Sequence, residues 1–189
     1  MRGGPIVGVL LAAGSGSRFG GAKLLAPLSD GKPIGIAALE HLAAAVDAVV
    51  AVVRPHDDEL AAALAARGAR ITTCPRAADG MGVSLAWGVR ASPAAAGWLI
   101  ALADMPWVQP ATNDRVVAAL RQGAAVAAPS RQGARGHPVG FAAVLYAELI
   151  ALSGDEGAQR VVARHDVLLI ETDDEGALRD VDTPKDLEA

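Results

Sequence analysis

Short apolar runs alternate with amphipathic segments along most of the chain, and this alternation restricts the fold more than any other feature. Five runs bounded by Gly, Pro or charge are typical of buried strands: Ile6–Leu11, Ala48–Val53, Trp98–Ala103, Ala124–Ala128 and Val167–Ile170. The segments with helical periodicity are Ile34–Ala45, Asp57–Ala66, Val83–Val89, Thr112–Leu120 and Ala142–Leu152. The pattern predicts an α/β fold, a Rossmann-like three-layer sandwich with a mostly parallel central sheet.

The chain is expected to form one domain over residues 1–189, because its length fits one core and no repeat or linker interrupts it. Right-handed crossovers place the loops that follow the strands at one edge of the sheet, where open α/β sheets bind ligands. We therefore consider a role in ligand binding first for the motifs that directly follow predicted strands. The segment Pro129–Phe141 carries several polar residues and is predicted to leave the sheet, in a position to cover the site.

Charge and cysteine content exclude several classes of partner. The net charge of −4 gives no overall positive field for a nucleic-acid backbone or an anionic membrane. Cys74 is the only cysteine, which excludes an internal disulfide and fits a reducing compartment, so it is expected to be a small buried hydrophobe. No signal peptide and no apolar stretch of about 18 residues is found. We expect a cytoplasmic protein that binds neither nucleic acid nor membrane.

A loop of small residues, Ala12–Lys23, follows the first predicted strand. Small residues let backbone N–H groups approach an anion, and the two cations of the loop, Arg18 and Lys23, can hold phosphate oxygens from both sides. The loop therefore predicts a triphosphate site. The expected nucleotide contacts of this segment are Leu11, Ala12, Ala13, Gly14, Ser15, Gly16, Arg18 and Lys23.

Two common glycine fingerprints do not fit this loop. A dinucleotide-binding fingerprint starting at Gly14 needs Gly where Phe19 stands, and a P-loop starting at Gly16 needs Lys where Ala22 stands. The alternative to a phosphate site is a solvated turn rich in Gly and Ser.

Two carboxylates are candidates for holding a metal ion. Asp104 directly follows the apolar run Trp98–Ala103, and Mg²⁺ prefers one or two carboxylates plus substrate phosphates, with Mn²⁺ as a substitute. Thr183 can cap the last predicted helix, so Asp182 is not needed as a cap and is preferred as the second ligand over its neighbour Asp180. The alternative for Asp104 is a turn or cap.

The start of a further predicted helix carries two candidate nucleotide contacts. Gly82 and Ser84 lie in its first turn, where backbone N–H groups can bind a nucleotide. The alternative is structural, with Gly82 ending a loop and Ser84 capping the helix. His41, His56 and His165 have no ligand spacing and are interpreted as structural.

Together these motifs resemble the molybdenum cofactor cytidylyltransferase family within the MobA-like NTP transferase superfamily. Leu11–Lys23 is similar to the signature loop of that family, Leu102–Pro106 to its Leu-Ala-Asp-Met-Pro motif, and Asp180–Pro184 to its Asp-Val-Asp-Thr-Pro motif. Ala13 stands where the guanylyltransferase branch has the first Gly of Leu-Ala-Gly-Gly, which indicates cytosine. The resemblance implies a fold of the nucleotide-diphospho-sugar transferase type.

The resemblance also assigns an acceptor side. The segment Gly133–Phe141 matches the cytidylyltransferase pattern, which implies that Arg135, Gly136, His137 and Pro138 help to hold a pterin or its phosphate. Asp155 lies in a turn similar to the Gly-Asp-x-Gly-Ala turn of the family, with a simple turn role as the alternative. The Arg expected after this turn is displaced to Arg160, so no role is transferred to that residue.

The implied reaction is transfer of CMP from CTP to the phosphate of molybdopterin with release of pyrophosphate. Asp104 and Asp182 would hold Mg²⁺, and Arg18, Lys23 and Asp104 would be the catalytic residues. The alternatives are transfer from GTP, transfer to another phosphorylated acceptor such as a sugar phosphate, and a non-catalytic carrier of nucleotide or pterin. Candidate protein partners are a molybdenum hydroxylase or its maturation factor.

Overall fold

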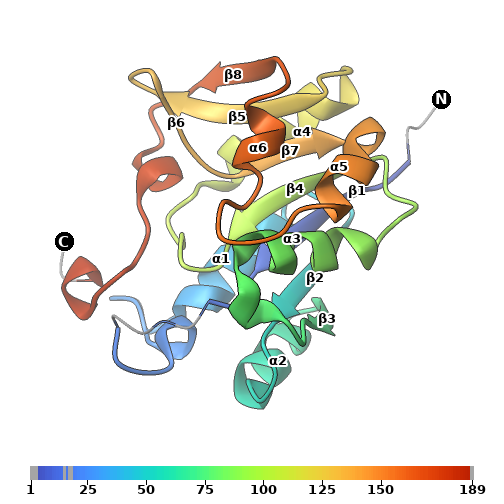
Figure 1. Cartoon of the computed structure of the whole chain (residues 1–189). Coiled ribbons are helices and arrows are strands. Elements are labelled where there is room, and N and C mark those ends of the chain that lie inside the picture. The colour runs from blue at the N-terminus through green and yellow to red at the C-terminus, as the bar shows by residue number, and fades with distance from the viewer. Residues whose placement is uncertain (1–3, 15, 17–18, 188–189) are drawn as a thin grey trace.

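The computed structural model (Figure 1) describes residues 4–14, 16 and 19–187. Its strands are β1 (Ile6–Leu11), β2 (Ala48–Val53), β3 (Arg70–Thr73), β4 (Gly97–Leu102), β5 (Val126–Arg131), β6 (Ala134–Arg135), β7 (Val139–Ala142) and β8 (Val167–Glu171). Its α-helices are α1 (Ile34–Ala43), α2 (Asp58–Ala65), α3 (Met81–Arg90), α4 (Pro110–Arg121), α5 (Tyr146–Ile150) and α6 (Gln159–Val162). None of the described helices is both long and apolar enough to cross a membrane.

The strands of the described residues form one sheet in the order β3-β2-β1-β4-β7-β5-β6, with β8 paired to β5. The pairs β2–β3, β1–β2, β1–β4 and β5–β8 are parallel. Strand β7 runs antiparallel between β4 and β5, and β6 pairs antiparallel with β5. The prediction of a single-domain α/β fold with a mostly parallel sheet is confirmed.

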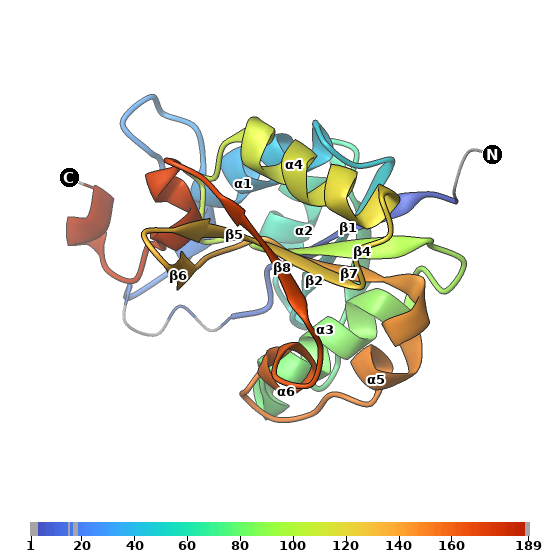
Figure 2. The same cartoon turned by 90° about the horizontal axis from the view of Figure 1, so that it is seen from above.

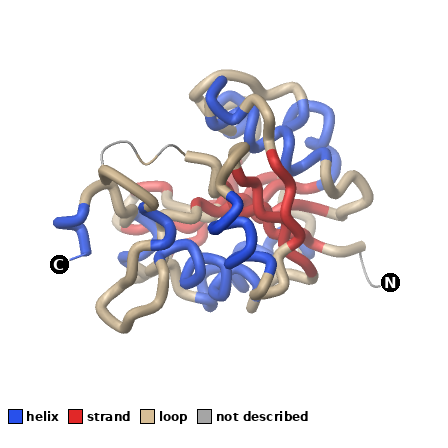
Figure 3. The backbone as a smooth tube through the Cα atoms, turned by 90° about the horizontal axis from the view of Figure 1, so that it is seen from below, coloured by secondary structure: helices blue, strands red, loops and turns tan. Residues whose placement is uncertain are grey.

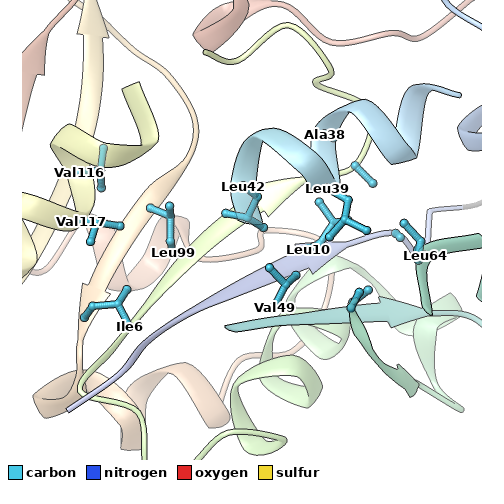
Figure 4. Packing of buried hydrophobic residues seen from close by; sticks show 14 of the residues in the cluster. Ile6, Leu10, Ala38, Leu39, Leu42, Val49, Leu64, Leu99, Val116 and Val117 are labelled. Carbon is cyan, nitrogen blue, oxygen red and sulfur yellow. The ribbon is translucent and has the colours of Figure 1, made fainter. Parts of the chain in front are cut away.

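Helices cover both faces of this sheet (Figures 2 and 3). Alternate residues of β1 point to opposite faces. Ile6 and Leu10 belong to the buried cluster that contains residues of α1, α2 and α4 (Figure 4), whereas Val7 and Val9 belong to the cluster with residues of α3, α5 and α6. Two buried layers therefore lie on either side of one sheet, as a three-layer sandwich requires.

The strand ends are aligned at one edge of the sheet. Leu11, the last residue of β1, is paired with Val52 on one side and with Leu102 on the other. The loops that follow β1, β2 and β4 consequently begin side by side. This alignment brings the glycine-rich loop and the loop that carries Asp104 to the same edge.

The prediction that Pro129–Phe141 leaves the sheet is wrong. Val139–Ala142 forms β7 inside the sheet, where Phe141 is fully buried opposite Trp98 and Val126. This strand is short and follows a turn of polar residues, so the sequence pattern does not indicate a strand there. The helix predicted to begin at Ala142 begins at Tyr146, because Ala142 ends the strand and a 3-10 turn intervenes.

Candidate active site

A cavity of about 620 Å³ opens where the parallel strands end. Its walls come from the glycine-rich loop, from the segments after β2, β3 and β4, from the first turn of α3 and from the loop before α6. The lining residues include Ala13, Gly14, Lys23, Arg54, Ser84, Asp104 and Asp155. Four of the predicted motifs thus contribute to one cavity.

Lys23 joins three segments that are far apart in the sequence. Its Nζ donates a hydrogen bond to Asp104 Oδ2 at 2.7 Å and another to the carbonyl oxygen of Val181 at 2.8 Å. The backbone N–H of Val181 donates to the carbonyl oxygen of Asp104 at 2.9 Å. In Figure 1 the C-terminal segment correspondingly lies beside the loop after β1. The glycine-rich loop, the Asp104 turn and the C-terminal motif therefore meet at one point.

The Lys23–Asp104 ion pair is largely shielded from water. The side chains of Lys23 and Asp104 are 12% and 27% exposed. Charges in such a position interact more strongly than a pair at an open surface, because water screens them less. A phosphate that enters the cavity would meet the ammonium group at short range.

Asp182 follows Val181 directly and is half-buried, whereas Asp180 is exposed. The carboxylate that caps the C-terminal 3-10 turn Pro184–Leu187 is that of Asp186. Asp186 Oδ2 accepts the backbone N–H groups of Thr183 at 2.6 Å and Asp182 at 3.0 Å, and the Thr183 hydroxyl at 3.0 Å. These donors, foremost the two of Thr183, lower the pKa of Asp186. Asp186 therefore accepts the hydrogen bonds of the residues that precede this turn.

The donor atoms at this point suit a hard divalent cation. Asp104 offers carboxylate oxygens, which Mg²⁺ and Mn²⁺ prefer, and Asp182 directly follows Val181, whose N–H donates to the carbonyl oxygen of Asp104. Within the described ranges, no group of three or more His, Cys, Asp or Glu side chains could hold a metal ion. A cation here would consequently need further oxygens from a substrate or water.

Not all of the predicted nucleotide contacts line the cavity. Leu11, Ala13, Gly14, Lys23, Ser84 and Asp104 line the cavity. Ala12 is buried and its N–H donates to the carbonyl oxygen of Val52 at 2.9 Å, so that donor already continues the sheet. Gly16 lies in the loop with a φ of 58°, which glycine adopts without strain. Ser15 and Arg18 lie outside the described residues.

The two candidate residues at the start of α3 have different surroundings. Ser84 lines the cavity and makes no capping hydrogen bond at the helix start. The N–H of Gly82 donates to the carbonyl oxygen of Gly154 at 2.8 Å, and a Cβ at Gly82 would lie 2.9 Å from the carbonyl oxygen of Ser153. Gly82 therefore lets the turn before α6 pack closely on the helix. That turn brings Asp155 to the cavity wall.

The predicted acceptor segment lies apart from this wall. Arg135, Gly136, His137 and Pro138 are not among the residues that line the cavity. The N–H of Gly136 donates to the carbonyl oxygen of Pro129, and that of His137 to the carbonyl oxygen of Ala177, each at 2.8 Å. His137 and Pro138 border Leu102 and Met105, the residues on either side of the Ala103–Asp104 turn. The acceptor segment therefore packs next to the turn that carries Asp104.

The pKa of His137 is lowered from 6.5, first by burial and then by the charge of Arg135, although Asp104 acts in the opposite direction. Folded protein then binds fewer protons than unfolded protein as the pH falls below 6.5. Stability is full above this pH and is lost as the pH falls through the lowered pKa. We expect His137→Asn to flatten this loss, by at most about 1.4 kcal/mol per pH unit. Urea unfolding of both proteins between pH 5 and pH 8 measures the difference, and parallel curves would contradict it.

Sequence reasoning missed Arg54, which lines the cavity and whose Nε lies 3.3 Å from Asp57 Oδ2. The signal was present, because Arg54 directly follows the predicted strand Ala48–Val53 and so begins at the ligand edge. Met81, at the start of α3, also lines the cavity with its side chain substantially exposed. An apolar thioether beside Ser84 gives this end of the cavity a less polar surface than the Lys23 end.

Comparison with known proteins places these features in a family. The model of the MobA-like NTP transferase domain matches residues 8–168. Purine catabolism protein PucB of Bacillus subtilis (strain 168) is 33% identical over 199 residues, covering 98% of this chain and 96% of that protein. Nicotine blue oxidoreductase of Paenarthrobacter nicotinovorans is 33% identical over 189 residues, covering 94% and 92%.

One solved structure is similar to this chain both in its fold and in its sequence. The crystal structure of Rv0371C from Mycobacterium tuberculosis H37Rv, in complex with manganese, superposes with a TM-score of 0.77 at 29% identity, covering 97% of this chain and 96% of that one. The matched family and these relatives span nearly the entire sheet and the cavity at its edge. The chain is a member of the MobA-like NTP transferase domain family.

Proposed function

We propose that this nucleotidyltransferase transfers CMP from CTP to the phosphate of molybdopterin and releases pyrophosphate, with Mg²⁺ as the metal. The observation that carries the proposal is the convergence of Lys23, Asp104 and the Val181–Asp182 segment beside the cavity. Nucleotidyl transfer follows from the family. The proposal goes beyond the family in naming CTP as the nucleotide, molybdopterin as the acceptor and Mg²⁺ as the metal.

On the donor side, the triphosphate would lie against the glycine-rich loop. Lys23 would neutralise charge on the phosphates, together with Arg18 from the same loop. Asp104 and Asp182 would hold the Mg²⁺, which when bound supplies positive charge to the phosphate oxygens. Lys23 already lies 2.7 Å from Asp104, so both positive charges would act on the same part of the substrate.

In the proposed step an oxygen of the acceptor phosphate attacks the α-phosphorus of CTP. One P–O bond forms, the bond from the α-phosphorus to the oxygen bridging the β-phosphorus breaks, and pyrophosphate leaves with that electron pair. The attacking phosphate is already ionised, so no side chain has to remove a proton. The task of the protein is to align two anions and stabilise the charge that develops.

Cytosine is favoured by one residue of the loop. Ala13 occupies the position at which the resembling guanylyltransferases have Gly, and Ala13 lines the cavity. A methyl group there reduces the space next to the backbone, which suits the smaller base. The molybdopterin acceptor is supported by the resemblance of Gly133–Phe141 to the cytidylyltransferase pattern. A molybdenum hydroxylase or its maturation factor would then receive the product.

Arg135→Ala is expected to raise the KM for the acceptor about tenfold, and the KM for CTP by less than about twofold. Arg135 is exposed on β6, and in the proposed complex it would pair with the acceptor phosphate; loss of one charged hydrogen bond has an effect of this size. Steady-state kinetics with each substrate varied in turn measures both constants. Arg131→Ala, at an arginine paired with Glu175, is the control. The opposite ranking would assign Arg135 to the triphosphate.

Pyrophosphate release, measured for CTP, GTP, ATP and UTP with molybdopterin or a sugar phosphate as acceptor, tests the function. We expect the highest kcat/KM for CTP with molybdopterin, no release without acceptor, and release about a hundredfold slower in Asp104→Asn. Preference for GTP or for a sugar phosphate would overturn the proposed substrates. Tight binding of nucleotide or pterin with no pyrophosphate release under any condition would identify a carrier.

A further inference from the structure

Three buried polar atoms belong to residues that line one small cavity, next to the turn that carries Asp104. They are Nδ1 of His41 on α1, Oδ1 of Asn113 on α4 and Nδ1 of His137 in the segment between β6 and β7. All three residues line a cavity of about 10 Å³. In the described part of the chain, none of the three atoms has a hydrogen-bond partner. They come from the acceptor segment and from α1 and α4, two helices that contribute Leu42 and Val116 to the same buried cluster.

The size and chemistry of this cavity restrict what it can hold. Its volume is close to that of one water-sized sphere, so an organic ligand does not fit. No carboxylate lines it, so a divalent cation would be buried without a compensating charge. A water molecule has two donors and two acceptors, and buried polar atoms of native proteins are generally paired with protein or with water.

We propose that one water molecule binds in this cavity and joins His41, Asn113 and His137 into a single hydrogen-bond network that positions the acceptor segment. His41 and Asn113 are then positioning residues, because they contact His137 through the water and not the substrate. The expected effect on acceptor binding rests on the proposed function, whereas the presence of the water and its hydrogen bonds does not depend on it.

The number of protons available in this network restricts the tautomers of the two imidazoles. Asn113 Nδ2 donates to the carbonyl oxygen of His41 at 2.9 Å, which orients the amide and leaves Oδ1 as a buried acceptor without a partner among the described residues. If both imidazoles carried their proton on Nε2, the water would face three acceptors with two hydrogens. At least one imidazole must therefore carry its proton on Nδ1 and donate to the water oxygen.

The network would complete the support of the acceptor segment. Backbone hydrogen bonds from Gly136 to Pro129 and from His137 to Ala177 already fix its main chain. The water would fix the ring of His137 against α1 and α4. Removing a wall of the cavity should loosen the segment that carries Arg135 and leave the Lys23–Asp104 pair unchanged, because that pair lies on the other cavity.

Crystal structures of the wild-type protein and of two variants at His41 test the site directly. His41→Leu removes the ring nitrogen at similar size, whereas His41→Asn places a polar atom close to the position of Nδ1. We expect a water within hydrogen-bond distance of the three residues in the wild type and in His41→Asn, and none in His41→Leu. Nitrogen-15 NMR of the wild type should show at least one of the two imidazoles as the Nδ1–H tautomer. Metal analysis should find no ion at this cavity.

The positioning role is tested by kinetics of the same variants. His41→Leu should raise the KM for molybdopterin about tenfold and change the KM for CTP by less than about twofold, and His41→Asn should restore the first value. Amide hydrogen exchange of His137 should rise in His41→Leu only. A wild-type cavity without water, a bound metal ion, or two Nε2–H imidazoles would overturn the network. Equal KM values in all three proteins would overturn its positioning role, and absence of transfer with every acceptor would overturn the proposed function instead.

Discussion

Lys23→Ala is expected to lower kcat about a hundredfold and to weaken CTP binding. Lys23 is the described cation that reaches both Asp104 and the C-terminal segment, and loss of one contact that stabilises the transition state costs about 2 to 4 kcal/mol. Single-turnover measurements at saturating CTP isolate the chemical step, and titration with CTP in the absence of acceptor isolates binding. Arg18→Ala should act in the same direction, since it is the other cation of the loop.

Lys32→Ala is a matched control for this experiment. Lys32 also forms a 2.7 Å ion pair, with Glu40, but it does not line the cavity. The pair is more exposed than that of Lys23, so its loss should change kcat by less than about twofold and stability by less than about 1 kcal/mol. A folded Lys23→Ala protein with the kinetics of Lys32→Ala would remove the glycine-rich loop from the reaction.

Asp104→Asn and Asp182→Asn are each expected to lower turnover about a hundredfold and to shift the magnesium dependence to higher concentration. An amide keeps the shape of the side chain and one oxygen but loses the negative charge that holds a hard cation. High Mg²⁺ should therefore recover part of the activity. The double variant should lose less than the product of the single losses, because both residues serve one ion.

Asp180→Asn is the control for the metal experiment. Asp180 and Asp182 flank Val181, whose N–H donates a hydrogen bond to Asp104, but Asp180 is exposed whereas Asp182 is half-buried. Both substitutions leave the cap intact, since Asp186 accepts the backbone N–H groups at that turn. Turnover against magnesium concentration should be unchanged in Asp180→Asn. If Asp180→Asn shows the defect and Asp182→Asn does not, the second ligand has been assigned to the wrong residue.

The convergence of these motifs at one edge of the sheet could be predicted because the strands carry a clear signal. Apolar runs end abruptly at Leu11 and at Ala103, and parallel strands bring such ends together. The contact of Lys23 with Asp104 then follows from the fold, although 81 positions separate the two residues. Cys74 is fully buried, as its sequence context indicates.

Other features could not be predicted because they depend on pairing between distant segments. Strand β7 has four residues, and only its place between β4 and β5 makes it a strand. The role of Gly82 depends on the turn at Gly154, which packs against it. His41 has no ligand spacing in the sequence, yet the fold places its ring beside the same cavity as His137. Local patterns do not contain such contacts.

The most direct test of the account is a crystal structure of the wild-type protein with Mn²⁺ and a CTP analogue whose α–β bridging oxygen is replaced by a methylene group. Anomalous scattering locates the metal without reference to activity. The account predicts the triphosphate along the glycine-rich loop, within reach of Lys23, and Mn²⁺ coordinated by carboxylate oxygens of Asp104 and Asp182. Nucleotide bound outside this cavity, or Mn²⁺ held without Asp104, would contradict it.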